Sequence, residues 1–176
     1  MPGSARSRFS CLPAAALGAA GLAIGAAASA QTVQTRLVPH EEVPAVSSAA
    51  SGSFKAFIDR RSGTISYTLS YENLQGDVRQ AHIHLGQHSV AGGIMVWLCQ
   101  TATNPDPTGL SPACPTAGSV GGVIQASSVI GPAAQGVDPL QFDELTRAIR
   151  LGVAYVNVHS SKFPAGELRG QLNDRP

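Results

Sequence analysis

Strict alternation of apolar and polar residues over residues 65–71 is the feature that most limits what this chain can fold into. Every second residue of this segment is a large apolar side chain, and the residues between them are serine or threonine. Successive side chains of a strand point to opposite faces, so the segment predicts a strand with one buried and one exposed face. Residues 53–59 alternate in the same way except at Phe57, and the sequence RRSG between the two segments predicts a turn.

Further short apolar segments follow and are separated by turn sequences rich in glycine, proline and asparagine. One helix interrupts them, with Asp138 expected as its N-cap, Pro139 as its first residue and Gly152 at its end. Trp97, the only tryptophan, lies in an apolar segment and is expected in the core. Many short strands and one short helix predict an all-β fold, an antiparallel Greek-key β-sandwich or barrel. The remaining expected strands are residues 79–85, 94–98, 120–129, 153–159 and 167–172.

The first 30 residues resemble an export signal. Arg6 and Arg8 precede an apolar run over residues 12–28, and Ala-Ser-Ala at positions 28–30 offers a cleavage site with small residues. We therefore expect a signal peptide at 1–30, one domain at 31–176 and a secreted or periplasmic location. An uncleaved anchor is the alternative, although the run is short and alanine-rich for a bilayer span.

The charge of the chain excludes several classes of partner. The sequence has 12 Lys and Arg against 11 Asp and Glu, and the expected leader removes two arginines, which leaves a formal charge of about −1. A nearly neutral domain without a basic run predicts no nucleic-acid partner and no anionic membrane surface. After signal cleavage no further membrane segment is expected. The remaining candidates are a protein or a metal ion, and the sequence does not define an oligomeric state.

The two cysteines of the expected mature chain, Cys99 and Cys114, predict a disulfide. An exported chain with two cysteines most simply pairs them. Closing a loop of about 15 residues contributes roughly 3 kcal/mol in the chain-entropy model. A metal thiolate pair is the alternative, but neither cysteine has a second Cys or His at the spacing of a zinc site.

Two histidines in the segment QAHIHLG, His82 and His84, share one face of an expected strand. Ile83 belongs to the opposite, apolar face, so the two imidazoles should point away from the core, at the surface or under a loop. The same argument gives His159, in YVNVHS, an outward position opposite to that of Val158. Imidazole is the commonest metal ligand, so three outward histidines predict a copper or zinc site if their strands are neighbours.

Two alternatives to a simple metal site remain open. The His-x-His pair is similar to the His-Val-His strand of Cu/Zn superoxide dismutase, another Greek-key sandwich, which suggests a redox metalloenzyme with superoxide-dismutase-like architecture. That enzyme needs further histidines and an aspartate for its zinc, and His88 is the only extra histidine nearby. Alternatively, the histidines belong to a structural polar network with Asn157, Glu167 and Arg169.

Three motifs carry a resemblance to a known family: LVPHEEVPAV (37–46), AHIHLG (81–86) and LGVAYVNVHSSKFPAGELRGQL (151–172). Together they resemble the CHRD domain, a module named after chordin and also found in exported bacterial proteins, over about residues 33–172. The segment LCQTATNPDPTGLSPACPTAG (98–118) departs from the usual pattern. The resemblance implies an all-β fold, an exported location and a poorly defined biochemical activity. Because the sequence has outward polar clusters but no complete catalytic set, we expect a binding or structural module rather than an enzyme, with no catalytic residue.

Overall fold

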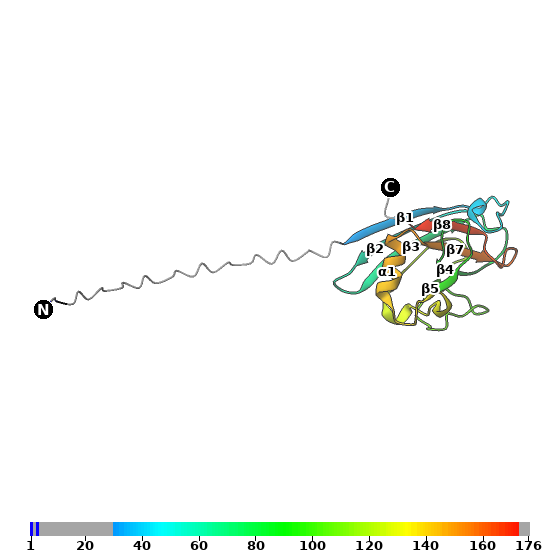
Figure 1. Ribbon diagram of the computed structural model, residues 1–176. Coiled ribbons are helices and arrows are strands. Elements are labelled where there is room, and N and C mark those ends of the chain that lie inside the picture. The colour runs from blue at the N-terminus through cyan, green and yellow to red at the C-terminus, as the bar shows by residue number, and fades with distance from the viewer. Residues whose placement is uncertain (2, 4–29, 173–176) are drawn as a thin grey trace.

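The computed structural model describes residues 1, 3 and 30–172, and the predicted signal peptide lies almost entirely outside them. The domain consists of two four-stranded sheets, which confirms the predicted all-β class (Figure 1). In the first sheet the strand order is β1 (Gln31–Leu37), β2 (Ser51–Asp59), β3 (Thr64–Glu72) and β6 (Gly118–Ile124). In the second sheet it is β5 (Gly93–Cys99), β4 (Val78–Leu85), β7 (Ala154–Ser160) and β8 (Leu168–Leu172).

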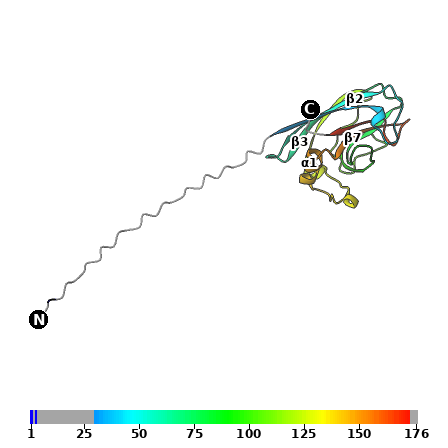
Figure 2. The same ribbon diagram turned by 45° about the horizontal axis from the view of Figure 1, so that its top comes forward.

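The connections form a Greek key, and every named strand pair is antiparallel. β5 lies against β6 at one junction of the two sheets, and β7 returns after a long connection to pair with β4. The resulting order β7-β4-β5-β6 is the Greek-key arrangement. At the other junction β1 lies against β8, where Val38 and Arg169 exchange backbone hydrogen bonds of 2.9 and 3.2 Å. Figure 2 shows the two layers with α1 near one end.

The core lies between the sheets and is built from the apolar faces that the alternation predicts. In β2 the exception Phe57 points outward and is 47% exposed, while its neighbours alternate as expected. Each sheet contributes its inward set. The buried residues include Phe54, Ile58, Ile65, Leu69 and Tyr71 from the first sheet, and Ile83, Val96, Val156, Val158, Leu168 and Leu172 from the second.

The predicted start of the helix is wrong, and its predicted end is correct. Helix α1 (Phe142–Arg150) begins after Leu140, whose φ of 72° is left-handed and cannot continue a right-handed helix. Asp138 is not the cap, because the helix begins at Phe142 and Gln141 occupies the N-cap position. Gly152 ends the helix with a φ of 69° and the two backbone hydrogen bonds of a Schellman motif.

Other elements differ from the sequence expectation at their ends. The first strand, β1, was not predicted, because only Val33 and Leu37 of its seven residues are fully buried and no alternation is visible. β6 ends at Ile124, earlier than expected, and a 3-10 helix, η2 (Ala126–Ser128), follows it. Two more 3-10 helices are η1 (Pro39–Glu41) and η3 (Ala133–Gln135).

The predicted disulfide is present between Cys99, at the end of β5, and Cys114 in the following loop. One hydrogen bond ties the segment after Cys114 to the first sheet, and others brace the loop internally. The Tyr71 hydroxyl of β3 donates to the Pro115 carbonyl at 2.5 Å, and the carboxylate of Asp106 accepts backbone N–H bonds from Thr108 and Ser111. Within the described part of the chain, no helix has the length and apolar character required to cross a membrane.

Candidate functional site

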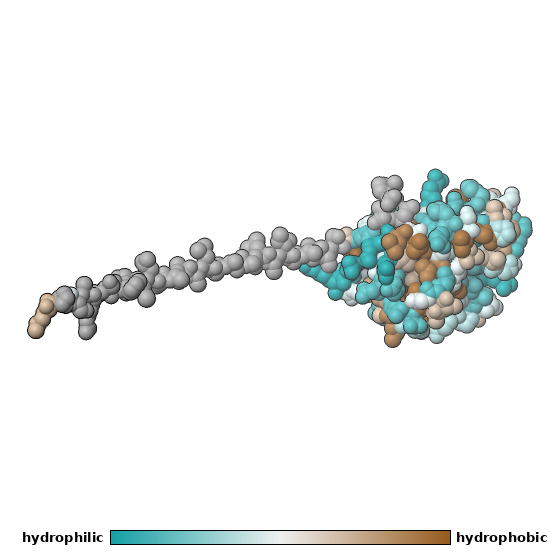
Figure 3. Space-filling model, in the orientation of Figure 1, coloured by the Kyte–Doolittle hydropathy of each residue, from teal (hydrophilic) through white to brown (hydrophobic). Residues whose placement is uncertain are grey.

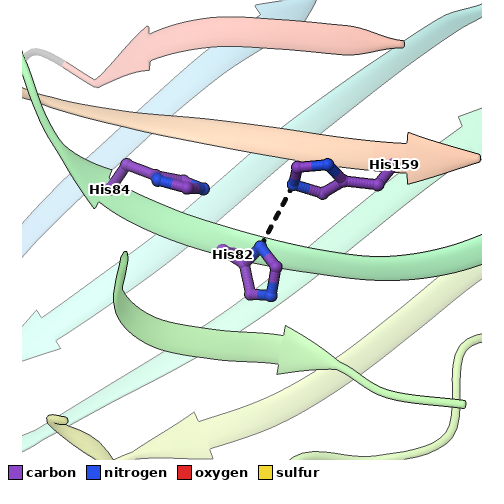
Figure 4. A group of neighbouring side chains, drawn as sticks. All are labelled: His82, His84 and His159. Carbon is purple, nitrogen blue, oxygen red and sulfur yellow. Dashed lines mark hydrogen bonds between the residues drawn. The ribbon is translucent and has the colours of Figure 1, made fainter. Parts of the chain in front are cut away.

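The strands that carry the three predicted histidines are direct neighbours. β4 and β7 pair so that Gln80 lies opposite His159 and His82 lies opposite Asn157. Residues that face each other across an antiparallel pair share one face, and side chains two positions apart on a strand share it too. Because of this register, His82, His84 and His159 all stand on the outer face of the second sheet, and Figure 4 shows their rings turned toward one another.

The three rings bring their nitrogens together. One ring nitrogen from each histidine can be chosen so that all three lie within 4.8 Å of one another. The shortest approach is 3.2 Å, between Nδ1 of His82 and Nε2 of His159 (Figure 4). The ring centroids are 5.0 Å apart for His82 and His159 and 5.4 Å apart for His82 and His84.

All three histidines are buried, although they point away from the sandwich core. Their exposed fractions are 0% for His82, 7% for His84 and 6% for His159. Loops cover the outer face at this point and bond to the rings. Nδ1 of His84 lies 2.9 Å from the carbonyl of Gly92, between β4 and β5, and Nδ1 of His159 lies 3.0 Å from the carbonyl of Pro164, between β7 and β8.

These loop carbonyls fix the tautomers of two rings. A carbonyl can only accept, so Nδ1 of His84 and of His159 must carry the proton, and Nε2 of each keeps a free lone pair. Nε2 of His159 then accepts from Nδ1 of His82, which leaves Nε2 of His82 without a proton. Among the described residues, Nε2 of His82 and Nε2 of His84 have no hydrogen-bond partner, and both atoms are buried.

Burial keeps the cluster neutral. Burial, together with smaller effects of the neighbouring rings of His159 and His84, lowers the pKa of His82 to about 2. Burial lowers the pKa of His84 to about 4 against the opposing effect of its bond to Gly92, and it lowers the pKa of His159 to about 4 against that of its bond to Pro164. All three side chains are therefore neutral imidazoles at pH 7, the form that binds metal ions.

Two aromatic rings form walls of the cluster. Trp97 lies opposite His82 in the β4–β5 pair, with ring centroids 4.3 Å apart, so the prediction that it belongs to the core is wrong. Trp97 stands between Val96 and Leu98, which both face the core, so strand alternation turns the indole to the outer face. On the other side, Tyr155 stacks on His84 at 4.8 Å, with only 7° between the ring planes.

The predicted polar-network residues, Asn157, Glu167 and Arg169, are buried on the same outer face but hydrogen-bond to other parts of the chain. Glu167 accepts from the Ser48 hydroxyl at 2.6 Å and from the Gln75 backbone at 2.8 Å. The guanidinium of Arg169 lies 3.5 Å over the Tyr155 ring. It donates to the carbonyls of Gln87 and Val90, in the loop between β4 and β5. None of the three bonds to a histidine side chain of the described residues.

Sequence reasoning missed Glu42, which belongs to the same buried layer of side chains on the outer face of the second sheet. It follows η1, is 8% exposed and accepts a hydrogen bond of 2.5 Å from the Asn157 amide. Burial raises the pKa of Glu42 to about 7, against the lowering effects of Arg169 and Asn157. Gly166 makes room for this contact, since a Cβ there would lie 2.6 Å from the Glu42 carboxylate. The only signal was its place in the motif LVPHEEVPAV.

Comparison with known protein families identifies the domain. The family model for the CHRD domain matches residues 33–172. The chain belongs to the CHRD domain family. No curated protein and no solved structure gave a significant match. In this CHRD domain, the histidine cluster comes from the two motifs AHIHLG and YVNVH, and Glu42 comes from the N-terminal motif. All three motifs on which the resemblance rests thus contribute to one buried layer on the second sheet.

Proposed function

We propose that this CHRD domain is an exported module that binds one transition-metal ion, copper or zinc, through His82, His84 and His159. The observation that carries the proposal is the convergence of three neutral ring nitrogens within 4.8 Å, under loops that exclude water. Imidazole nitrogens suit both metals. The expected leader and the Cys99–Cys114 disulfide support an oxidising, extracytoplasmic location.

The ligand atoms would be Nδ1 of His82 and Nε2 of His84 and His159. The ion would replace the hydrogen bond between His82 and His159, and the proton of His82 would move from Nδ1 to Nε2. In His84 and His159 the other ring nitrogen, Nδ1, donates a hydrogen bond to a backbone carbonyl. Hydrogen bonds of this kind orient most metal-bound imidazoles. Metal–nitrogen bonds of about 2.0–2.1 Å at tetrahedral angles put ligand atoms roughly 3.3 Å apart. The 3.2 Å between His82 and His159 already has this value, and the ligand nitrogen of His84, within 4.8 Å of the other two, would have to move closer.

A purely structural role for the cluster is the competing explanation. The His82–His159 hydrogen bond fits it, but Nε2 of His84 is then left buried without a partner. An unsatisfied buried polar atom costs about 1–3 kcal/mol. A bound ion gives Nε2 of His84 a partner, whereas Nε2 of His82 has none with or without the ion.

Metal analysis of the purified chain tests the proposal. We expect one equivalent of copper or zinc after equilibration at micromolar concentration, and we expect His84→Ala to abolish it. His88→Ala is the matched control, because the side chain of His88 is 63% exposed and lies 3.6 Å from Glu41, outside the cluster. If wild type binds no metal, or if His84→Ala keeps the same stoichiometry, the histidines are a scaffold. The redox alternative would additionally require superoxide consumption that the same substitution abolishes.

A further inference from the structure

The charge of the candidate site determines which ion it can accept. We propose that the site takes monovalent copper, Cu(I), in preference to Zn(II) and Cu(II). This inference rests on the proposed function, because it assumes that His82, His84 and His159 bind one ion. It goes beyond that function by naming the oxidation state.

Every candidate ligand atom at the site is neutral. The cluster of potential metal ligands consists of the three histidines alone, with no carboxylate or thiolate among the described residues close enough to join it. The cationic group that acts on the cluster is Arg169, which contributes to lowering the pKa of His84. A bound ion therefore keeps its full charge and lies near a second positive charge.

The acidic residues of the same layer do not supply the missing counter-charge. Glu42 bonds to Asn157, and its pKa of about 7 leaves it only partly ionised at neutral pH. One oxygen of Glu167 is engaged by Ser48 and Gln75. Neither carboxylate acts on the pKa of the three histidines, and neither belongs to the cluster of potential ligands.

Burial makes the charge of the ion decisive. The Born energy of transferring an ion from water to a medium of low dielectric constant rises with the square of the charge, so a dication is about four times as costly as a monocation. Three-histidine zinc sites of enzymes keep a fourth position for water, which lowers the net charge when it ionises. Here the rings of Trp97 and Tyr155 pack directly against His82 and His84. For Cu(I), three nitrogen donors complete the coordination.

Neutral nitrogen ligands alone do not predict that a site binds Cu(I) more tightly than Cu(II). In an open nitrogen site, divalent copper binds more tightly than any other divalent first-row metal. A preference for Cu(I) would therefore have to arise from the burial and the charge of this cluster, because neutral imidazoles alone do not disfavour Cu(II).

Competition titrations of the metal-free chain test the preference. Cu(I) is titrated without oxygen against a chromogenic Cu(I) chelator, and Zn(II) and Cu(II) are titrated against chelators of their own. The fluorescence of Trp97 reports binding directly, since it is the only tryptophan and its ring touches His82. From the Coulomb energy of one additional unit charge in a buried site, we expect Cu(I) to bind at least about 100-fold more tightly than either dication.

Each outcome has a distinct meaning. If Zn(II) or Cu(II) binds as tightly as Cu(I) and His84→Ala abolishes that binding, the preference is wrong and the metal site stands. If none of the three ions binds, the proposed function itself fails, and the preference fails with it.

Arg169 offers a second test of the electrostatic cause. Arg169→Gln removes the cation and should lower the ratio of the Cu(I) affinity to the Zn(II) affinity by about 10-fold. Arg169→Lys keeps the charge and should preserve most of that ratio. Circular dichroism shows whether each variant folds, because Arg169 also bonds to Gln87 and Val90. If folded Arg169→Gln keeps the wild-type ratio of the two affinities, the positive charge of Arg169 does not cause the preference. If neither variant folds, the wild-type titrations alone decide.

Discussion

The outer faces of the two sheets are both polar, yet only one of them meets solvent. On the first sheet, Lys55 and Ser70 stand on a surface that water reaches. Figure 3 shows hydrophilic residues over much of the visible face of the domain, around a central hydrophobic area. On the second sheet, His82, Asn157 and Arg169 occupy equivalent outward positions and are at most 3% exposed. A polar group that faces water needs no protein partner, whereas a buried one must find one. The difference shows that alternation defines the face of a side chain but not its environment.

Acidification should produce the largest effect, and it acts through the buried face. The three histidines have pKa values far below that of an unfolded histidine, near 6.5, so below that pH the unfolded chain binds protons that the folded chain does not. Stability present above pH 6.5 is lost as the pH falls toward 4, by up to about 1.4 kcal/mol per pH unit for each histidine.

The titration of Glu42 has the opposite effect on stability and reduces the loss of stability on acidification. Its pKa is raised from 4.5 to about 7, so its contribution is present at low pH and is lost as the pH rises from 4.5 through 7. Urea unfolding between pH 4 and 7.5 measures the sum, and His159→Asn should flatten the profile where the exposed-site variant His88→Ala does not. A wild-type stability that is independent of pH over this range would mean that the cluster is accessible to water.

Removing a cation from each outer face compares the two faces directly. Arg169→Ala should lower the free energy of unfolding by about 3–5 kcal/mol, because two loop carbonyls lose their donor and buried Glu42 loses its opposite charge. Lys55→Ala, on the exposed face, should stay within about 0.5 kcal/mol of wild type. Chemical denaturation of both variants measures the difference, and equal effects would remove the contrast between the faces.

A smaller effect is expected for two uncharged residues. Asn157→Ala should cost about 1–3 kcal/mol, since the Glu42 carboxyl loses a buried hydrogen bond. Ser70 bonds to Ser119 at 2.6 Å on the exposed face, where water can replace the partner, so Ser70→Ala should change stability by less than about 0.5 kcal/mol. Thermal unfolding of the two variants checks this, and a Ser70→Ala effect as large as that of Asn157→Ala would contradict the account.

Much of the fold could be read from the sequence because it depends on short-range patterns. Alternation placed Ile65, Ile83 and Val156 in the core, and it placed the three histidines on one outer face. The turn chemistry at Gly152 ended the helix correctly. Cys99 and Cys114 are the only two cysteines of the expected mature chain, which made their pairing the simplest expectation.

The parts that the sequence could not provide depend on long-range contacts. The burial of the histidine cluster comes from loops whose carbonyls, at Gly92 and Pro164, bond to the rings, and no local pattern encodes that docking. Glu42 joins Asn157 across 115 residues. Trp97 faces outward between Val96 and Leu98, and the uniformly apolar segment did not show which of its two faces would be buried when β5 pairs with β4.

We propose that three imidazoles of one buried layer form a metal site. X-ray absorption at the metal edge of the loaded chain tests it most directly. We predict a first shell of three nitrogens near about 2.0 Å with the outer-shell scattering of imidazole, and the loss of bound metal in His84→Ala but not in His88→Ala. A first shell of sulfur or of oxygen alone, or an unchanged spectrum from metal-loaded His84→Ala, would contradict the account.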